Sequence, residues 1–131
     1  MATSRRKFLL TTPALALAAS LPTFAHADEK QLVHHVYFWL KNASSKDDLN
    51  KLIEGISTLR PIPTVKQFRL GVPAATTKRD VIDDSYAVSL FTVFDDVKGH
   101  DVYQEHPIHL KFIEKYSHLW NKVVVYDSMD I

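Results

Sequence analysis

Residues 103–112, Tyr-Gln-Glu-His-Pro-Ile-His-Leu-Lys-Phe, place a tyrosine, two histidines and a proline within seven positions. Proline has a fixed φ and no backbone N–H, so it suits the first turn of a helix. His106 is therefore the expected N-cap of a helix that begins at Pro107 and reaches residue 119 or 120. Residues on one stripe of this helix are spaced by three or four: His109, Phe112, Ile113, Tyr116 and Trp120. This spacing predicts that His109 faces the interior.

Tyr103 lies at the end of another helix that we expect over residues 95–104. An imidazole in the first turn of a helix lies beside the positive end of the helix dipole, which disfavours the charged form and keeps the ring neutral near pH 7. A neutral imidazole accepts a proton, and a phenol donates a hydrogen bond. Together these groups support proton abstraction next to a carbonyl, with His109 as the general base and the Tyr103 hydroxyl stabilising the enolate.

Less specific interpretations of the same histidines stay open. An inward histidine more often forms a hydrogen bond within a core than takes part in catalysis. The pair His106-x-x-His109 is a weak metal signal, because a metal site usually needs three or four ligands and the sequence contains no cysteine. We therefore predict no metal site, and we interpret three further histidines as solvated or core residues: His35, His100 and His118.

Changes in hydrophobic period divide the rest of the chain into elements. Segments with alternating or β-branched character predict four strands, over residues 32–41, 64–71, 85–94 and 122–128. Apolar residues at helical spacing predict a helix over residues 44–59, with Ser44 or Ser45 as its N-cap. Pro61 and Pro63 end this helix. Asp95 and Asp96 are typical of the start of the helix over residues 95–104, and residues 73–84 form a polar surface loop.

This order of elements predicts an α+β fold of the ferredoxin-like split βαβ type, a four-stranded antiparallel sheet with helices on one face. In the first strand, alternation separates His34, Val36, Phe38 and Leu40 from Val33, His35, Tyr37 and Trp39. In the third, it groups Tyr86, Val88, Leu90, Thr92 and Phe94. Both faces of the first strand carry large apolar groups. We therefore expect a homodimer in which a second copy covers the open sheet face.

The composition fits one globular domain, with 131 residues, 46% hydrophobic and 24% charged. Sixteen basic and fifteen acidic residues give no bulk charge that would attract nucleic acid or a membrane surface. Residues 1–27 differ, because paired arginines lead into an Ala/Leu-rich stretch that ends in Ala25-His26-Ala27. This pattern resembles a bacterial twin-arginine export signal, and an uncleaved N-terminal anchor is the alternative.

Cleavage after Ala27 leaves residues 28–131 as the mature domain. It removes three basic residues and no acidic ones, so the net charge changes from +1 to −2. The expected location is periplasmic or otherwise exported, with no stable membrane anchor after cleavage. With no cysteine, the mature domain has no disulfide, and its stability depends on packing and dimerisation.

Several of these motifs together resemble the stress-responsive dimeric α/β barrel (Dabb) family. They are the segment 34–41, the Pro61-Ile62-Pro63 break followed by Gly71, and above all Tyr103-x-x-His106-Pro107-x-His109 with Phe112. The resemblance covers residues 31–128 and implies a ferredoxin-like subunit that pairs through its sheet. In family members of the olivetolic acid cyclase type, a histidine and a tyrosine matching His109 and Tyr103 drive an aldol-type ring closure.

The resemblance also matches a histidine of those cyclases to His34, whereas two other pocket residues of theirs fall on Val88 and Gly55. From the residues and the resemblance together, His109 and Tyr103 are the expected catalytic residues. The expected ligand-binding residues are His34, His106, Phe112, Val36, Phe38 and Val88.

Three functions follow from this site. The first is an exported dimer that binds a small apolar ligand without catalysis, and the second is a cofactor-free cyclase or lyase acting on a carbonyl compound. The third is a haem or metal carrier, for which the sequence offers no recognisable ligand set.

Overall fold

The computed structural model describes residues 30–131, and the predicted export signal over residues 1–27 lies outside this range. Residues 30–131 form four strands and three α-helices, in the order β1 (Leu32–Leu40), α1 (Lys46–Ser57), β2 (Gln67–Gly71), β3 (Val88–Phe94), α2 (Val97–Glu105), α3 (Pro107–Tyr116) and β4 (Trp120–Met129). A short 3₁₀ turn, η1 (Ser117–Leu119), joins α3 to β4.

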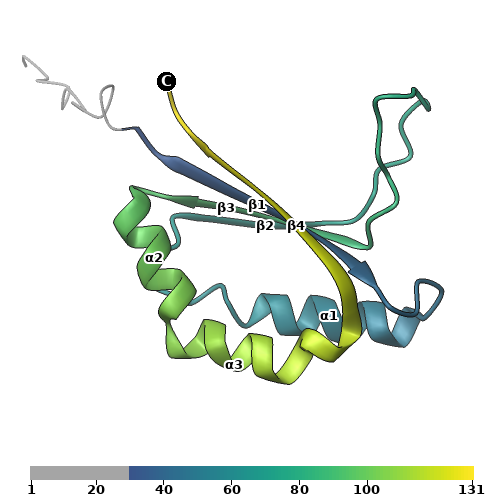
Figure 1. Cartoon of the computed structure of the whole chain (residues 1–131), viewed down its shortest axis with the longest axis horizontal. Coiled ribbons are helices and arrows are strands. Elements are labelled where there is room, and N and C mark those ends of the chain that lie inside the picture. The colour runs from purple at the N-terminus through teal and green to yellow at the C-terminus, as the bar shows by residue number, and fades with distance from the viewer. Residues whose placement is uncertain (1–29) are drawn as a thin grey trace, which may run out of the picture.

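The strands form one antiparallel sheet in the order β2-β3-β1-β4. All three helices lie on the same side of this sheet, and the other side is open (Figure 1). The predicted ferredoxin-like α+β fold is therefore confirmed. Strand β1 occupies a central position, with β3 on one side and β4 on the other.

Burial along β1 alternates as the sequence predicted. His34, Val36 and Phe38 are buried against the helices, whereas the residues between them are half-buried on the open face. The strand register places His34 opposite Thr92 of β3 and opposite Asp127 of β4. One buried histidine is thereby flanked by two polar residues from neighbouring strands.

The helices begin where capping side chains satisfy free backbone N–H groups. Ser45 accepts a hydrogen bond from the Asp48 N–H at the start of α1, and Asp96 accepts one from the Gly99 N–H at the start of α2. His106 caps α3, because its Nδ1 accepts a hydrogen bond 3.1 Å long from the Ile108 N–H. The predicted capping role of His106 is confirmed.

Most predicted boundaries shift by one to four residues, and one predicted face differs from the structure. Strand β2 begins at Gln67 rather than at residue 64, and α3 changes to a 3₁₀ turn after Tyr116. Strand β3 begins at Val88 rather than at residue 85, because the Asp83 carboxylate accepts hydrogen bonds from the Ser85 N–H and hydroxyl and holds a turn there. The Tyr86 ring consequently contacts Tyr37 and Trp39 on the open face, so its predicted position with Val88 was wrong.

The open face of the sheet carries a continuous set of aromatic side chains. The Tyr37 ring lies 4.5 Å from His35, 4.9 Å from Tyr86 and 6.1 Å from Tyr126, measured between ring centroids. Tyr126 is 65% exposed although it lies within this set. A large apolar area of this kind on one sheet face is typical of an interface.

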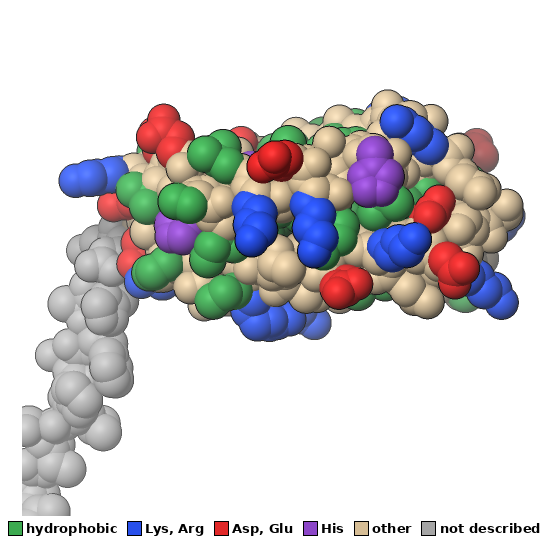
Figure 2. Space-filling view, turned by 90° about the horizontal axis from the view of Figure 1, so that it is seen from below, with side chains coloured by type: hydrophobic (Ala, Val, Ile, Leu, Met, Phe, Trp, Pro, Cys, Tyr) green, Lys and Arg blue, Asp and Glu red, His purple; other side chains and the backbone are tan. Residues whose placement is uncertain are grey.

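The helix side has a mixed surface, on which basic and acidic side chains are interspersed with hydrophobic ones (Figure 2). Several of the exposed hydrophobic residues belong to α2 and α3: Val97, Val102, Leu110 and Ile113. Within residues 30–131, no helix has the length and apolar character needed to cross a membrane.

Helices α1 and α3 approach each other closely at Gly55, which faces the ring of Tyr116. A Cβ atom at position 55 would lie 2.5 Å from Cγ of Tyr116. This ring is 8% exposed, and Ile56 beside it is fully buried. The absent side chain at position 55 thus provides the space that the Tyr116 ring occupies.

We expect the substitution Gly55→Ala to lower the free energy of unfolding by about 1–3 kcal/mol, because the added methyl group overpacks this contact. In a Tyr116→Ala background the same substitution should instead be neutral or stabilising by up to about 1 kcal/mol, since alanine favours helix more than glycine does. Urea denaturation of the four proteins measures both effects. A destabilisation of equal size in both backgrounds would contradict the proposed contact.

Candidate functional site

A cavity of about 150 Å³ lies between the sheet and helices α2 and α3. Its walls are mostly apolar and are formed by Val36, Phe38, Leu59, Leu90, Phe112, Ile113, Trp120, Val123 and Val125. The polar groups in its lining are His34, Tyr103, Gln104 and His109. An apolar hollow with a few convergent polar groups is the usual form of a small-molecule site.

Tyr103 of α2 is almost completely buried, with 1% of its surface exposed. Its ring contacts three aromatic neighbours, with centroid distances of 5.0 Å to Phe94, 5.9 Å to His34 and 4.8 Å to His109. Burial raises the pKa of the Tyr103 hydroxyl far above its usual value, so the group remains a hydrogen-bond donor at any physiological pH.

His109 lies in the first turn of α3 and points toward Tyr103. Its Nδ1 atom is buried and has no hydrogen-bond partner among residues 30–131. Burial lowers the pKa of His109, and the nearby His34 and His100 lower it further, whereas the backbone of Gln104 acts in the opposite direction. The ring is therefore neutral near pH 7, as predicted, although burial rather than the helix dipole is the main cause.

His34 is 4% exposed and is held on two sides. Its Nδ1 lies 2.5 Å from Oδ1 of Asp127, and its backbone carbonyl accepts a hydrogen bond 2.8 Å long from the Thr92 hydroxyl. Burial lowers the pKa of His34, while the hydrogen bond and the charge of Asp127 raise it. Because burial dominates, we expect a neutral ring whose Nδ1–H donates to the carboxylate.

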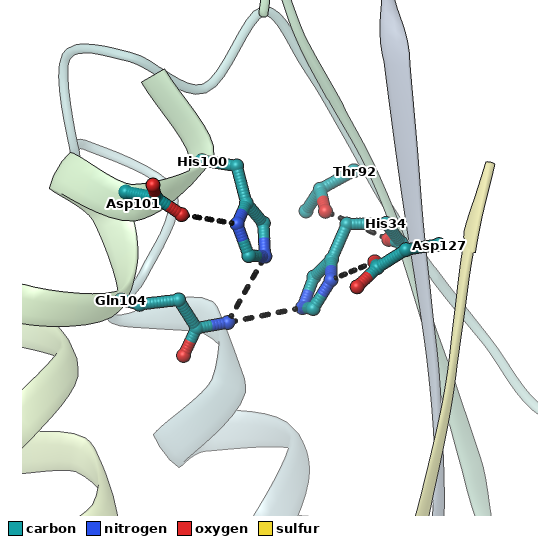
Figure 3. Close-up of polar contacts among 6 residues, drawn as sticks. All are labelled: His34, Thr92, His100, Asp101, Gln104 and Asp127. Carbon is teal, nitrogen blue, oxygen red and sulfur yellow. Dashed lines mark hydrogen bonds and ion pairs between the residues drawn. The ribbon is translucent and has the colours of Figure 1, made fainter. Parts of the chain in front are cut away.

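A second histidine, His100 of α2, completes a polar network beside the cavity (Figure 3). The amide nitrogen of Gln104 lies 3.3 Å from Nε2 of His100 and 3.5 Å from Nε2 of His34. Nδ1 of His100 lies 3.2 Å from Oδ1 of Asp101. The centroids of the two imidazole rings are 4.7 Å apart.

Sequence reasoning missed three members of this network: His100, Gln104 and Asp127. Two signals were available. His100 and Gln104 are separated from each other by one helical turn and share a face with Tyr103, and Asp127 interrupts the apolar alternation of Val123 and Val125. The pairing of β1 with β4, which brings Asp127 to His34, is visible only in the structure.

The structure brings together six of the eight residues predicted for the site. His34, Val36, Phe38, Tyr103, His109 and Phe112 all line the cavity. His106 and Val88 do not, and these two placements are corrected. The Nδ1 atom of His106 is occupied in capping α3, and Val88 is fully buried at the opposite end of the β1–β3 pairing from His34. Ile113, predicted to face inward, lines the cavity but is 40% exposed.

A family model described as the stress responsive A/B barrel domain (Dabb) matches residues 32–130. The chain belongs to the Dabb family. No curated protein is significantly similar to it in sequence. The matched segment includes the whole sheet, all three helices and every residue that lines the cavity.

Solved structures confirm this fold. A Dabb family protein from Mesorhizobium loti with a ferredoxin-like fold is 22% identical, with a TM-score of 0.63, and the match covers 78% of this chain and 98% of that one. A hydroxynitrile lyase from Passiflora edulis is 19% identical, with a TM-score of 0.66 and coverage of 79% and 95%. A dimeric ferredoxin-like protein of unknown function from Thermobifida fusca is 19% identical, with a TM-score of 0.61 and coverage of 77% and 92%.

Proposed function

We propose that this Dabb protein binds a small, mostly apolar molecule with one carbonyl-type oxygen in the cavity beside His109. The observation that carries this proposal is the combination of apolar walls with a buried polar atom that lacks a partner. Within residues 30–131, Nδ1 of His109 is buried without a hydrogen bond, and Tyr103 lines the same cavity. An unpaired buried polar group costs about 1–3 kcal/mol, which a ligand with a matching acceptor or donor recovers.

The size of the cavity limits the ligand to a compact molecule. An apolar protein cavity of about 150 Å³ is known to hold benzene. The cavity of this protein has the same volume, so a single ring with a short substituent fits it. Because Tyr103 donates a hydrogen bond, a ketone or aldehyde should bind better than a hydrocarbon of the same shape.

We expect acetophenone to bind about fivefold more tightly than ethylbenzene, since one net hydrogen bond contributes about 1 kcal/mol. Trp120 lines the cavity, so quenching of its fluorescence reports binding. The variant Tyr103→Phe keeps the ring and removes only the hydroxyl. It should bind both compounds equally, and His118→Ala should retain the preference. If neither acetophenone nor ethylbenzene binds to the unmodified protein, the proposal is wrong.

The proposed form of the protein is a homodimer that forms through the open sheet face. The aromatic set around Tyr37 and Tyr126 supports this arrangement, because solvent exposure of so much apolar surface is unfavourable. The structures from Thermobifida fusca and Jannaschia sp. are described as dimeric and have the same fold.

We also propose that the protein is exported through a twin-arginine-like signal that is cleaved after Ala27. This part of the proposal rests on the sequence of residues 1–27.

Native mass spectrometry of protein produced from the full chain in a bacterium tests both parts of this form. We expect a dimer of residues 28–131 in the exported fraction. Tyr126→Glu places a charge in the aromatic set and should convert the dimer to a monomer, whereas Val81→Glu, in an 80% exposed loop position, should not. A monomeric unmodified protein would contradict the proposed dimer. An exported protein that keeps residues 1–27 would contradict the proposed cleavage after Ala27.

A second candidate function is acid–base catalysis on the bound carbonyl compound. The packing of the His109 ring on the Tyr103 ring favours it, and a hydroxynitrile lyase shares the fold. In the proposed step, His109 takes a proton from the carbon next to the carbonyl. The electrons of that C–H bond form the enolate double bond, and the negative oxygen accepts a hydrogen bond from Tyr103. No cofactor is required.

Exchange of the acetophenone methyl protons for deuterium, followed by NMR, measures this step directly. We expect His109→Ala to slow the exchange by about 10²- to 10⁴-fold, while His118→Ala, at an exposed position outside the cavity, has little effect. The rate should fall as the pH is lowered through the depressed pKa of His109, because only the neutral ring accepts a proton. Binding of acetophenone without exchange above the rate in buffer would leave the binding function and exclude catalysis of this type.

A further inference from the structure

Three metal-ligating side chains from separate elements meet beside the cavity. His34 belongs to β1, His100 to α2 and Asp127 to β4, and one ligand atom from each lies within 4.8 Å of the others. The three differ in exposure, at 4% for His34, 15% for His100 and 46% for Asp127. The group therefore extends from the buried sheet to the protein surface.

The two imidazoles direct their Nε2 atoms toward the same side chain. Gln104 lies next to Nε2 of both rings, and its amide group donates to them in this arrangement. An ion that binds both Nε2 atoms takes the place of these two hydrogen bonds. Nδ1 of each ring lies next to a carboxylate, Asp127 for His34 and Asp101 for His100, and therefore carries the proton. The pair of His100 with Asp101 has the usual form of a histidine metal ligand, which is a neutral ring oriented by a carboxylate.

We propose that His34, His100 and Asp127 form a binding site for one divalent transition metal ion, with Zn²⁺ as the best match. Two imidazoles and one carboxylate are a ligand set that proteins use for zinc and other first-row metals. Since Zn–N and Zn–O bonds are about 2.0–2.2 Å long, neighbouring ligand atoms of a tetrahedral site lie about 3.3 Å apart. His34 is fixed by burial, whereas the partly exposed side chains of His100 and Asp127 can rotate to meet this requirement. When it rotates, Asp127 exchanges its hydrogen bond with Nδ1 of His34 for a bond to the ion.

The proposed metal site adjoins the cavity. His34 and Gln104 line the cavity and also belong to the network around the metal ligands. Three protein ligands leave a fourth coordination position, as in zinc sites that bind water or a ligand. The site differs from the His106-x-x-His109 pair considered from the sequence, because His106 lies outside the cavity and caps α3.

Titration of the untagged mature protein with Zn²⁺ by isothermal calorimetry tests the inference. We expect about one ion per protomer, and a rise in melting temperature with added Zn²⁺ that a chelator reverses. His100→Gln and Asp127→Asn should each weaken binding by about 100-fold or more. Both substitutions lie at partly exposed positions, and circular dichroism of the metal-free variants verifies that they fold.

Two matched variants and a spectroscopic probe complete the test. His118→Ala and Asp84→Ala remove an exposed histidine and an exposed aspartate elsewhere, and should leave Zn²⁺ binding unchanged. Co²⁺ in place of Zn²⁺ should give the visible absorption of a four-coordinate ion. Retained affinity in both His100→Gln and Asp127→Asn, or no binding by the unmodified protein, would overturn the inference. Acetophenone binding is measured separately, in the presence of a chelator. Failure of the metal site and failure of ligand binding in the cavity can therefore be told apart.

Discussion

The pairing of β1 with both β3 and β4 is the constraint on which the rest of the structure depends. Because β1 is central, its alternation decides which side chains face the helices and which form the open face. A shift of the register by one residue would move His34 to the open face and separate it from Asp127. The core, the cavity and the polar network therefore all follow from one strand alignment.

Burial then gives the site its chemical character. In water an imidazole and a phenol are ordinary titrating groups, but the apolar walls disfavour the charged form of each. His109 is held as a neutral acceptor and Tyr103 as a neutral donor, at the same end of one cavity. Desolvation is the largest cause of the pKa shift of both residues, and for His109 the nearby His34 and His100 act in the same direction.

Much of this arrangement was predictable from the sequence, for identifiable reasons. The periods of β1 and α1 and the proline at residue 107 are local signals, so the fold, the buried face of β1 and the cap at His106 were predicted correctly. The position of Tyr86 was not, because a turn held by Asp83 interrupts the apparent strand. The contact of His34 with Asp127 joins residues 93 positions apart, and no local pattern specifies such a contact.

Because α1 and α3 lie close together, the side chains that fit at residues 55 and 116 depend on each other. The ring of Tyr116 and any side chain at residue 55 would occupy the same volume, so the protein can fill this space from one helix or from the other, but not from both. A larger residue at position 55 therefore requires a smaller one at position 116, and the side chain that fills the layer between the helices would then enter it from α1 instead of α3.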